Sequence, residues 1–218
     1  MGIADRIENI LGKSLKVIAK DLNYDKSNIF ILENKIEELQ RECPEIYINL
    51  ESCGHHRDGR TQIQYAKDLI ASWIFEDNFL KELKSTELEI ELNGADSERK
   101  ILSSSKTKTT SDYIIKKGVN NKNIELMSSY TNYWKDAKKI DLRDNKYNEM
   151  ASKEVILLCI DMFNKEFFTI DIKNCNAIHI PKHKPYGDKP AYSISLKSIN
   201  PQAYNIEEIA KALKSYLS

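Results

Sequence analysis

Two acidic residues, Asp112 and Glu125, lie in a segment whose pattern predicts a β-hairpin. Apolar residues dominate on both sides of a polar turn at residues 118–121, which contains a glycine. Pairing Lys117 with Lys122 would place Glu125 diagonally beside Asp112 on the same face of the sheet. Side chains alternate between the faces of a strand, so a one-residue shift of this register would separate the two carboxylates. The sequence therefore predicts two neighbouring carboxylates on a rigid sheet.

Two carboxylates this close repel each other unless a cation neutralises them. Oxygen ligands on a rigid scaffold suit Mg²⁺, which keeps several waters and also binds substrate phosphates. Each residue also has a purely structural interpretation, because Asp112 could cap a turn and Glu125 could face solvent. An acidic residue between Ile124 and Leu126 is disfavoured in a strand, so we expect both carboxylates to bind Mg²⁺ and to act in catalysis.

The pattern Ser111-Asp112, a hairpin, and then Glu125-Leu126-Met127 resembles the PD-(D/E)xK nuclease superfamily, especially the type II restriction endonucleases. The resemblance covers about residues 62–172, with a long helix before the hairpin and a helix and an apolar strand after it. Ser111 stands where the motif has Pro, and Met127 stands where it has Lys. The resemblance implies a restriction-endonuclease-like core that hydrolyses phosphodiester bonds of double-stranded DNA with Mg²⁺.

Met127, which the expected register places opposite Asp112, leaves the motif without its lysine. In this nuclease class the amine orients or deprotonates the attacking water and offsets the phosphate charge. A helix expected to begin near Leu142 would pack across the site, so we expect Lys146 on that helix to supply the amine, with Arg143 as the second candidate. The alternative is that Lys146 lies on a solvated helix face. Two related restriction-enzyme families resemble this arrangement in lacking the motif's Lys, so its absence is compatible with cleavage.

A third carboxylate could complete the metal site. Glu76 lies on the long helix predicted for residues 62–83, and Asp96 follows the strand predicted for residues 87–92. By analogy with the family we expect Glu76 to be the metal neighbour, although a residue at such a position can equally be exposed.

Hydrophobic periodicity divides the chain into three regions. They are an N-terminal helical region for DNA binding or dimerisation (1–61), the nuclease core (62–176), and a C-terminal loop and helix for DNA contact or dimerisation (177–218). After the hairpin the expected elements are a segment at 135–152 that is mostly helical after Asp141, strands at 155–162, 167–172 and 192–196, and a last helix at 206–217. Helices around a mixed sheet predict an α/β or α+β fold.

Three polar loops carry basic side chains that could bind phosphate oxygens. Three such loops flanking a carboxylate hairpin favour a groove that holds duplex DNA. The candidate DNA-binding residues are Arg57 and Arg60 in the first loop, Lys106 and Lys108 in the second, Lys182, Lys184 and Lys189 in the third, and Arg143 on the helix.

The 218 residues include 33 basic and 33 acidic side chains, so the formal net charge is zero. A protein that coats DNA non-specifically is normally basic, so this balance favours an enzyme that concentrates positive charge in one cleft. The sequence contains no stretch of about 18 apolar residues, so we expect no membrane association. Scattered cysteines and the lack of a signal-peptide pattern predict a cytoplasmic protein.

These features together predict a type II restriction enzyme, a Mg²⁺-dependent and sequence-specific endonuclease. Cutting both strands of a palindromic site requires two active sites related by a dyad, so we expect a homodimer. The alternatives are a catalytically inactive DNA-binding protein of the same fold, a Holliday-junction resolvase, and an unrelated interaction protein whose hairpin carboxylates face solvent.

Overall fold

The computed structural model describes residues 72, 76, 79–94, 111–129 and 131–218. The chain divides into two compact units, Met1–Glu82 with Gly94–Lys108, and Leu83–Asn93 with Thr109–Ser218. The second unit contains both acidic residues of the hairpin and has an α+β fold built on a mixed sheet.

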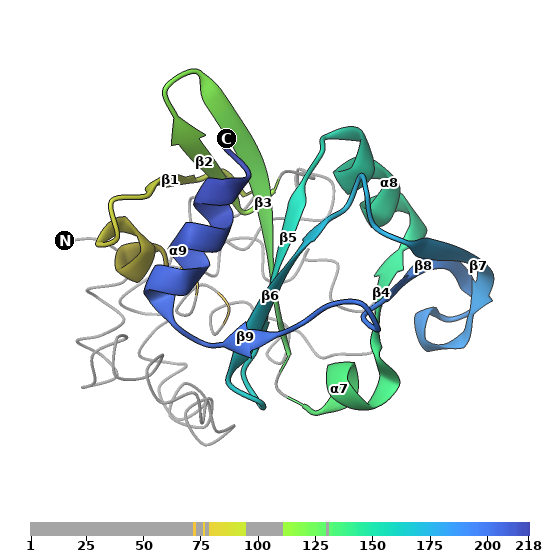
Figure 1. Ribbon diagram of the computed structural model, residues 1–218. Helices are drawn as coiled ribbons and strands as arrows, with labels where there is room; N and C mark the ends of the chain where they lie inside the picture. Colours follow the sequence, from red (N-terminus) through yellow and green to blue (C-terminus); the bar gives the residue numbers. More distant parts are fainter. Residues whose placement is uncertain (1–71, 73–75, 77–78, 95–110, 130) are drawn as a thin grey trace, which may run out of the picture. The chain divides into compact units, whose positions relative to one another are not determined.

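A six-stranded sheet forms the centre of the second unit, with its strands in the order β1-β2-β3-β5-β6-β9 (Figure 1). Its strands are β1 (Glu89–Leu92), β2 (Tyr113–Lys117), β3 (Asn120–Ser129), β5 (Ile156–Asp161), β6 (Glu166–Asp171) and β9 (Gln202–Ala203). β3 and β5 are parallel, whereas the other neighbours are antiparallel. Parallel neighbours need a crossover connection, and the connection from β3 to β5 carries α7 (Tyr133–Ala137), β4 (Lys139–Arg143) and α8 (Asp144–Ser152). The crossover therefore brings a helix back beside the hairpin.

All six residues of β5 are buried. Its run Ile-Leu-Leu-Cys-Ile-Asp is typical of a strand that is covered on both faces. One face is covered by α9 (Ile206–Ser215), which lies across the sheet in Figure 1. The side chain of Asn205 starts α9 by accepting hydrogen bonds from the backbone N–H groups of Glu207 and Glu208, at 2.9 and 3.2 Å.

A three-stranded antiparallel sheet, in the order β4-β8-β7, lies on the other face of β5. Its strands are β4 (Lys139–Arg143), β8 (Lys189–Ser195) and β7 (Ala177–His183). The helix α7 (Tyr133–Ala137) precedes β4, and α8 (Asp144–Ser152) follows β4 directly. One core cluster joins these elements to β5 and β6, and it includes Trp134, Ile140, Leu142, Met150, Leu157, Cys159, Phe168 and Ile194.

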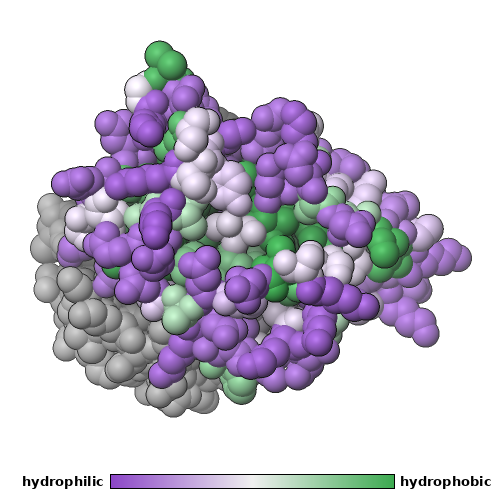
Figure 2. Space-filling view, in the orientation of Figure 1, coloured by the Kyte–Doolittle hydropathy of each residue, from purple (hydrophilic) through white to green (hydrophobic). Residues whose placement is uncertain are grey.

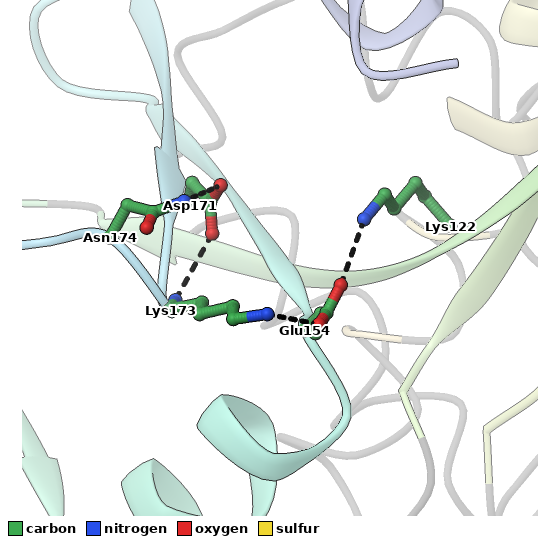
Figure 3. Close-up of polar contacts among 5 residues, drawn as sticks. All are labelled: Lys122, Glu154, Asp171, Lys173 and Asn174. Carbon is green, nitrogen blue, oxygen red and sulfur yellow. Dashed lines mark hydrogen bonds and ion pairs between the residues drawn. The ribbon is translucent and has the colours of Figure 1, made fainter.

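Glu154 connects neighbouring strands through ion pairs with two lysines (Figure 3). It lies in the turn before β5. Its carboxylate contacts the ammonium group of Lys173, which follows β6, and lies 3.3 Å from the ammonium group of Lys122 on β3. The Lys173 turn is fixed by Asp171, whose carboxylate accepts hydrogen bonds from the Lys173 backbone at 3.0 Å and the Asn174 side chain at 2.8 Å. Lys173 and then Lys122 lower the pKa of Glu154 below its ordinary value. These contacts hold β3, β5 and β6 together at one end of the sheet.

Most predicted elements within the described residues are confirmed. The hairpin, the two apolar strands β5 and β6, the strand β8 and the last helix α9 occur where the sequence predicts them, with shifted bounds. The long helix predicted for residues 62–83 is helical at Ser72, at Glu76 and over 79–84. The N-terminal helical region and the loops at 44–61 and 95–110 lie outside the described residues.

Two strands depart from the prediction. β4 is a strand that the sequence analysis did not predict, and it overlaps the first two residues of the part predicted to be helical. β7 occupies a stretch predicted as a loop. β4 is only five residues long, and its Lys-Ile-Asp-Leu-Arg alternation is a strand pattern too short to stand out against the helical segment around it. β7 contains Pro181, which is tolerated because β7 is an edge strand with an irregular register between Ile180 and His183.

The expected hairpin register is also wrong. Lys117 pairs with Asn120 rather than with Lys122, so the turn consists only of Gly118 and Val119. Gly118 has a φ of 60°, which glycine adopts without steric cost at the first position of such a turn. Val119 is 96% exposed, and the hairpin tip projects at the top of Figures 1 and 2. The shift is two residues, so each side chain keeps its predicted face.

Within the described part of the chain, no helix is long and apolar enough to cross a bilayer. Charged and polar side chains dominate the face of the second unit that Figure 2 shows.

Replacing Glu154 with Gln should lower the melting temperature slightly at pH 7 in low salt, because two ammonium groups lose their carboxylate partner. Because the pKa of Glu154 is lowered, its contribution is present above the ordinary value of 4.5 and is lost as the pH falls through its folded-state pKa. Melting curves of the two proteins should therefore converge once the pH falls below that folded-state pKa, and also in about 1 M salt.

The matched control is Glu89→Gln, an exposed carboxylate on β1 that makes no ion pair with any described residue. This control should melt like the wild type at every pH. Equal melting temperatures for wild type and Glu154→Gln at pH 7 in low salt would show that the ion pairs contribute nothing.

Candidate active site

Asp112 lies immediately before β2. Extending the hairpin register by one residue pairs Asp112 with Glu125. The last register pair joins Tyr113 to Ile124, and both of these side chains are fully buried on one face. Because faces alternate along a strand, Asp112 and Glu125 belong to the opposite face. That face of β3 is the one whose partners on β5 include Leu157 in the core beneath α8.

The carboxylate of Asp112 extends the hydrogen-bond ladder of the hairpin. Its Oδ2 accepts a hydrogen bond from the backbone N–H of Leu126 at 2.7 Å. The backbone carbonyl of Asp112 accepts a second hydrogen bond from the N–H of Asn93 at 2.9 Å. Asp112 is therefore anchored between β1 and β3, with a carboxylate beside the backbone that carries Glu125.

Ser111 fixes the chain just before Asp112. It is 6% exposed, and its hydroxyl donates to Asn123 Oδ1 at 3.1 Å. The side chain of Asn93 donates to Ser111 Oγ at 3.2 Å and to the Ser111 carbonyl at 3.3 Å. Asn93 and Asn123 thus hold Ser111, and with it Asp112, in place. In the sequence, only the presence of a polar residue in or next to a strand indicated that these asparagines form such hydrogen bonds.

Glu125 is buried at 8% exposure and contacts the ammonium group of Lys146. The distance from Lys146 Nζ to Glu125 Oε1 is 2.5 Å. Lys146 lies in the first half of α8, four residues before Met150, so the two share a helix face. Met150 packs in the core, so the Lys146 side chain lies at the edge of that core, where it contacts Glu125 on β3.

The charged groups around Lys146 raise its pKa above the ordinary value. Burial is the largest single influence and lowers that pKa, but Glu125, Asp112 and Tyr186 together outweigh it, so the net shift is upward. Lys146 is therefore an ammonium ion at neutral pH. Lys146 therefore contacts Glu125 directly and lies within electrostatic range of Asp112.

Met127 packs against the core cluster instead of adding a charge to the site. It shares a face with Glu125, two residues earlier on β3, and its register partner on β5 is the fully buried Cys159. The amine beside the carboxylates comes from α8, at the position that the sequence predicts for Lys146. Its catalytic role remains a prediction.

The other candidate residues fall into three groups. Arg143 ends β4, and its guanidinium lies 5.6 Å from the centre of the Tyr186 ring. The third-loop lysines Lys182, Lys184 and Lys189 are exposed on the hairpin formed by β7 and β8. Glu76 belongs to the first unit, and Asp96, Arg57, Arg60, Lys106 and Lys108 lie outside the described residues.

A polar cluster centred on the buried side chains of Asp141 and His183 is absent from the sequence-based predictions. We call it the Asp141 cluster, and it contains Tyr133, Lys139, Asp141, His183 and Tyr186. Burial would raise the pKa of Asp141, but hydrogen bonds from Lys139, Ser193 and His183 outweigh it and lower that pKa. The signal for the cluster was the alternation in β4, which sets Asp141 on the face opposite the buried Ile140 and Leu142.

The described residues contain no group of three or more His, Cys, Asp or Glu side chains placed to hold a metal ion. Within the described part of the chain, the candidate metal ligands at the hairpin are therefore the two carboxylates of Asp112 and Glu125. Oxygen donors of this kind fit Mg²⁺, which completes its shell with water and substrate phosphate.

No protein-family model matches the chain, and no curated protein matches it in sequence.

Replacing Lys146 with Met should lower the free energy of unfolding by about 1 kcal/mol at pH 7, because the buried Glu125 loses its counter-charge while Lys146 itself is half exposed. The pKa of Lys146 is raised, so this contribution is complete below its ordinary value of 10.5 and disappears as the pH rises through the folded-state pKa. Urea unfolding at pH 7 and at several points above pH 10 measures both effects.

Lys146→Arg, which keeps the charge, is the control and should retain most of the stability. If Lys146→Met were as stable as the wild type at pH 7, the Lys146–Glu125 contact would have no energetic weight.

Proposed function

We propose that the second unit carries the active site of a Mg²⁺-dependent endonuclease that cuts double-stranded DNA at specific sequences, as type II restriction enzymes do. One observation carries this proposal. A strand-borne carboxylate, Glu125, meets an ammonium group, Lys146, within 2.5 Å, and a second carboxylate, Asp112, acts on the same ammonium. Two carboxylates and a lysine are the groups that the PD-(D/E)xK resemblance requires, with the lysine supplied from a helix.

The two carboxylates would hold the metal, and the lysine would bind the phosphate. When bound, Mg²⁺ supplies an activated water and polarises the phosphoryl oxygen. Asp112 is anchored through the Leu126 N–H, and Glu125 is enclosed at the core margin, so both ligands are held in fixed positions. Lys146, charged at neutral pH, would stabilise the negative charge that develops on the phosphate.

The fold supports a restriction-endonuclease-like core for the second unit. The hairpin β2–β3 is followed by a crossover with α8 and then by β5, which is parallel to β3 and buried on both faces. The order of hairpin, helix and apolar strand is the one that the resemblance implies, and it supports the proposed core.

The exposed lysines of the β7–β8 hairpin would bind the DNA backbone. A palindromic site would be cut by a homodimer with one active site on each strand, and the enzyme would work in the cytoplasm.

A second candidate function is DNA binding without cleavage. This alternative is favoured because both carboxylates already interact with groups of the same chain and need no metal ion. Glu125 is neutralised by Lys146, and Asp112 accepts a hydrogen bond from the Leu126 N–H. The core position of Met127 also fits this alternative.

Digestion of a phage genome in Mg²⁺ tests the proposed function. The wild-type protein should give discrete bands, and EDTA should abolish them. Asp112→Asn and Glu125→Gln should each slow cleavage by at least about 100-fold, because each removes a metal ligand. Lys146→Met should slow cleavage about 100-fold, and Lys146→Arg should restore most of the rate if positive charge is what the lysine supplies.

Glu154→Gln is the matched control, because it removes a carboxylate that is paired with lysines elsewhere on the sheet. It should cut at the wild-type rate. Intact DNA with retained duplex binding would support the non-cleaving alternative, and a protein that neither binds nor cuts DNA would refute both functions.

A further inference from the structure

Asp141 ties the β7–β8 hairpin to β4 by two separate contacts. Its side chain is 8% exposed, and its Oδ2 accepts hydrogen bonds from Lys139 Nζ at 2.8 Å, His183 Nε2 at 3.1 Å and Tyr133 Oη at 3.2 Å. Its backbone carbonyl accepts a hydrogen bond from Tyr186 Oη at 2.7 Å. His183 and Tyr186 both belong to the tip of the hairpin, so the tip is fixed on β4.

The hairpin tip is itself a tight turn. Lys184–Tyr186 form a single 3-10 turn that ends at Gly187, and the backbone N–H of Asp188 bonds the His183 carbonyl at 3.1 Å. The rings of His183 and Tyr186 lie 4.7 Å apart. Burial, and then Asp141, raise the pKa of Tyr186, so its hydroxyl stays protonated and able to donate.

Tyr186 presents the face of its ring to Arg143. The guanidinium of Arg143 lies 5.6 Å from the ring centre, in the range of a cation–π contact. Arg143 is exposed, and among the described residues no carboxylate forms an ion pair with it. The aromatic ring therefore supports a guanidinium whose hydrogen-bond donors remain available for an anion.

Arg143 and Lys146 lie at the same end of α8. Arg143 is the N-cap residue of α8, and Lys146 lies three positions later in the first turn of the helix. The Tyr186 ring contacts the Arg143 guanidinium, so Tyr186 lies at this same end of α8. The Arg143–Tyr186 pair thus lies next to the site formed by Lys146, Glu125 and Asp112.

We propose that Arg143, supported by Tyr186 and the Asp141 cluster, binds a backbone phosphate of the DNA strand adjacent to the phosphate that is cut. This inference rests on the proposed nuclease function and adds a substrate-positioning residue to it. A guanidinium recognises phosphate with two parallel hydrogen bonds, and stacking on an aromatic ring fixes its plane. Tyr186, His183 and Asp141 act through Arg143 as positioning residues.

The test measures binding and cleavage of a fluorescent duplex by Arg143→Ala. KM should rise about tenfold with little change in kcat, because the contact is equal in the ground and transition states. Duplex affinity, measured by anisotropy in EDTA and in Ca²⁺, should lose about 0.9 from the slope of log K against log salt, the amount for one phosphate. Arg143→Lys should keep the slope and show a smaller rise in KM.

A second variant separates positioning from folding. Tyr186→Leu should raise KM in the wild-type background and have little further effect in the Arg143→Ala background, since it acts only through Arg143. Lys211→Ala, an exposed cation on α9 that is 79% exposed, is the control and should leave KM and the salt slope unchanged.

If the wild type cuts DNA while Arg143→Ala keeps the wild-type KM and salt slope, the inference is overturned and the nuclease function stands. Additive effects of Tyr186→Leu and Arg143→Ala would also overturn the positioning role. A wild-type protein that binds no duplex under any of these conditions would overturn both proposals.

Discussion

The placement of a carboxylate at the edge of an apolar core depends on a counter-charge. Glu125 is almost fully buried on a strand whose neighbours are hydrophobic, and an unpaired charge there would be strongly unfavourable. Lys146 provides that counter-charge, and it can do so only because α8 begins directly after β4 and packs Met150 into the core. The crossover between the parallel strands β3 and β5 therefore supplies the lysine that pairs with Glu125, and it also sets the topology of the sheet.

The charge of Lys146 is set by two opposing effects. Burial lowers its pKa, whereas the carboxylates of Glu125 and Asp112 raise it. A divalent cation bound to those carboxylates would remove much of the second effect and leave the first. In the proposed enzyme, metal binding would thus shift Lys146 away from a permanent ion pair and toward interaction with water or phosphate. Tyr186 joins Arg143 to the Asp141 cluster, because its ring contacts the guanidinium and its hydroxyl donates to the Asp141 carbonyl.

The sequence predicts the parts of this arrangement that depend on local pattern. The apolar run of β5, the amphipathic α9 and the hairpin around Gly118 are each set by residues close in the chain. Lys146 could be identified as the amine beside the carboxylates, because the helix after the hairpin had to cross near it. The exact register was not predictable, since Lys117 has polar partners available at both Asn120 and Lys122.

The remainder depends on contacts between distant segments. β4 becomes a strand because β8, some fifty residues later, pairs with it, and β7 becomes an edge strand despite Pro181 because β8 offers the other side. The Asp141 cluster joins residues from α7, β4 and the β7–β8 hairpin, which no local pattern brings together. Tertiary pairing thus decided the elements for which local propensity was weak.

Binding of Mn²⁺, a paramagnetic substitute for Mg²⁺, tests the shared carboxylate site most directly when it is followed by electron paramagnetic resonance in the absence of DNA. The wild type should bind Mn²⁺, Asp112→Asn and Glu125→Gln should each bind it at least about tenfold more weakly, and Lys146→Met should bind it more tightly, because the ammonium competes for the same carboxylate. Equal Mn²⁺ binding by the wild type and both carboxylate variants, or no binding by any of them, would show that Asp112 and Glu125 do not form a metal site.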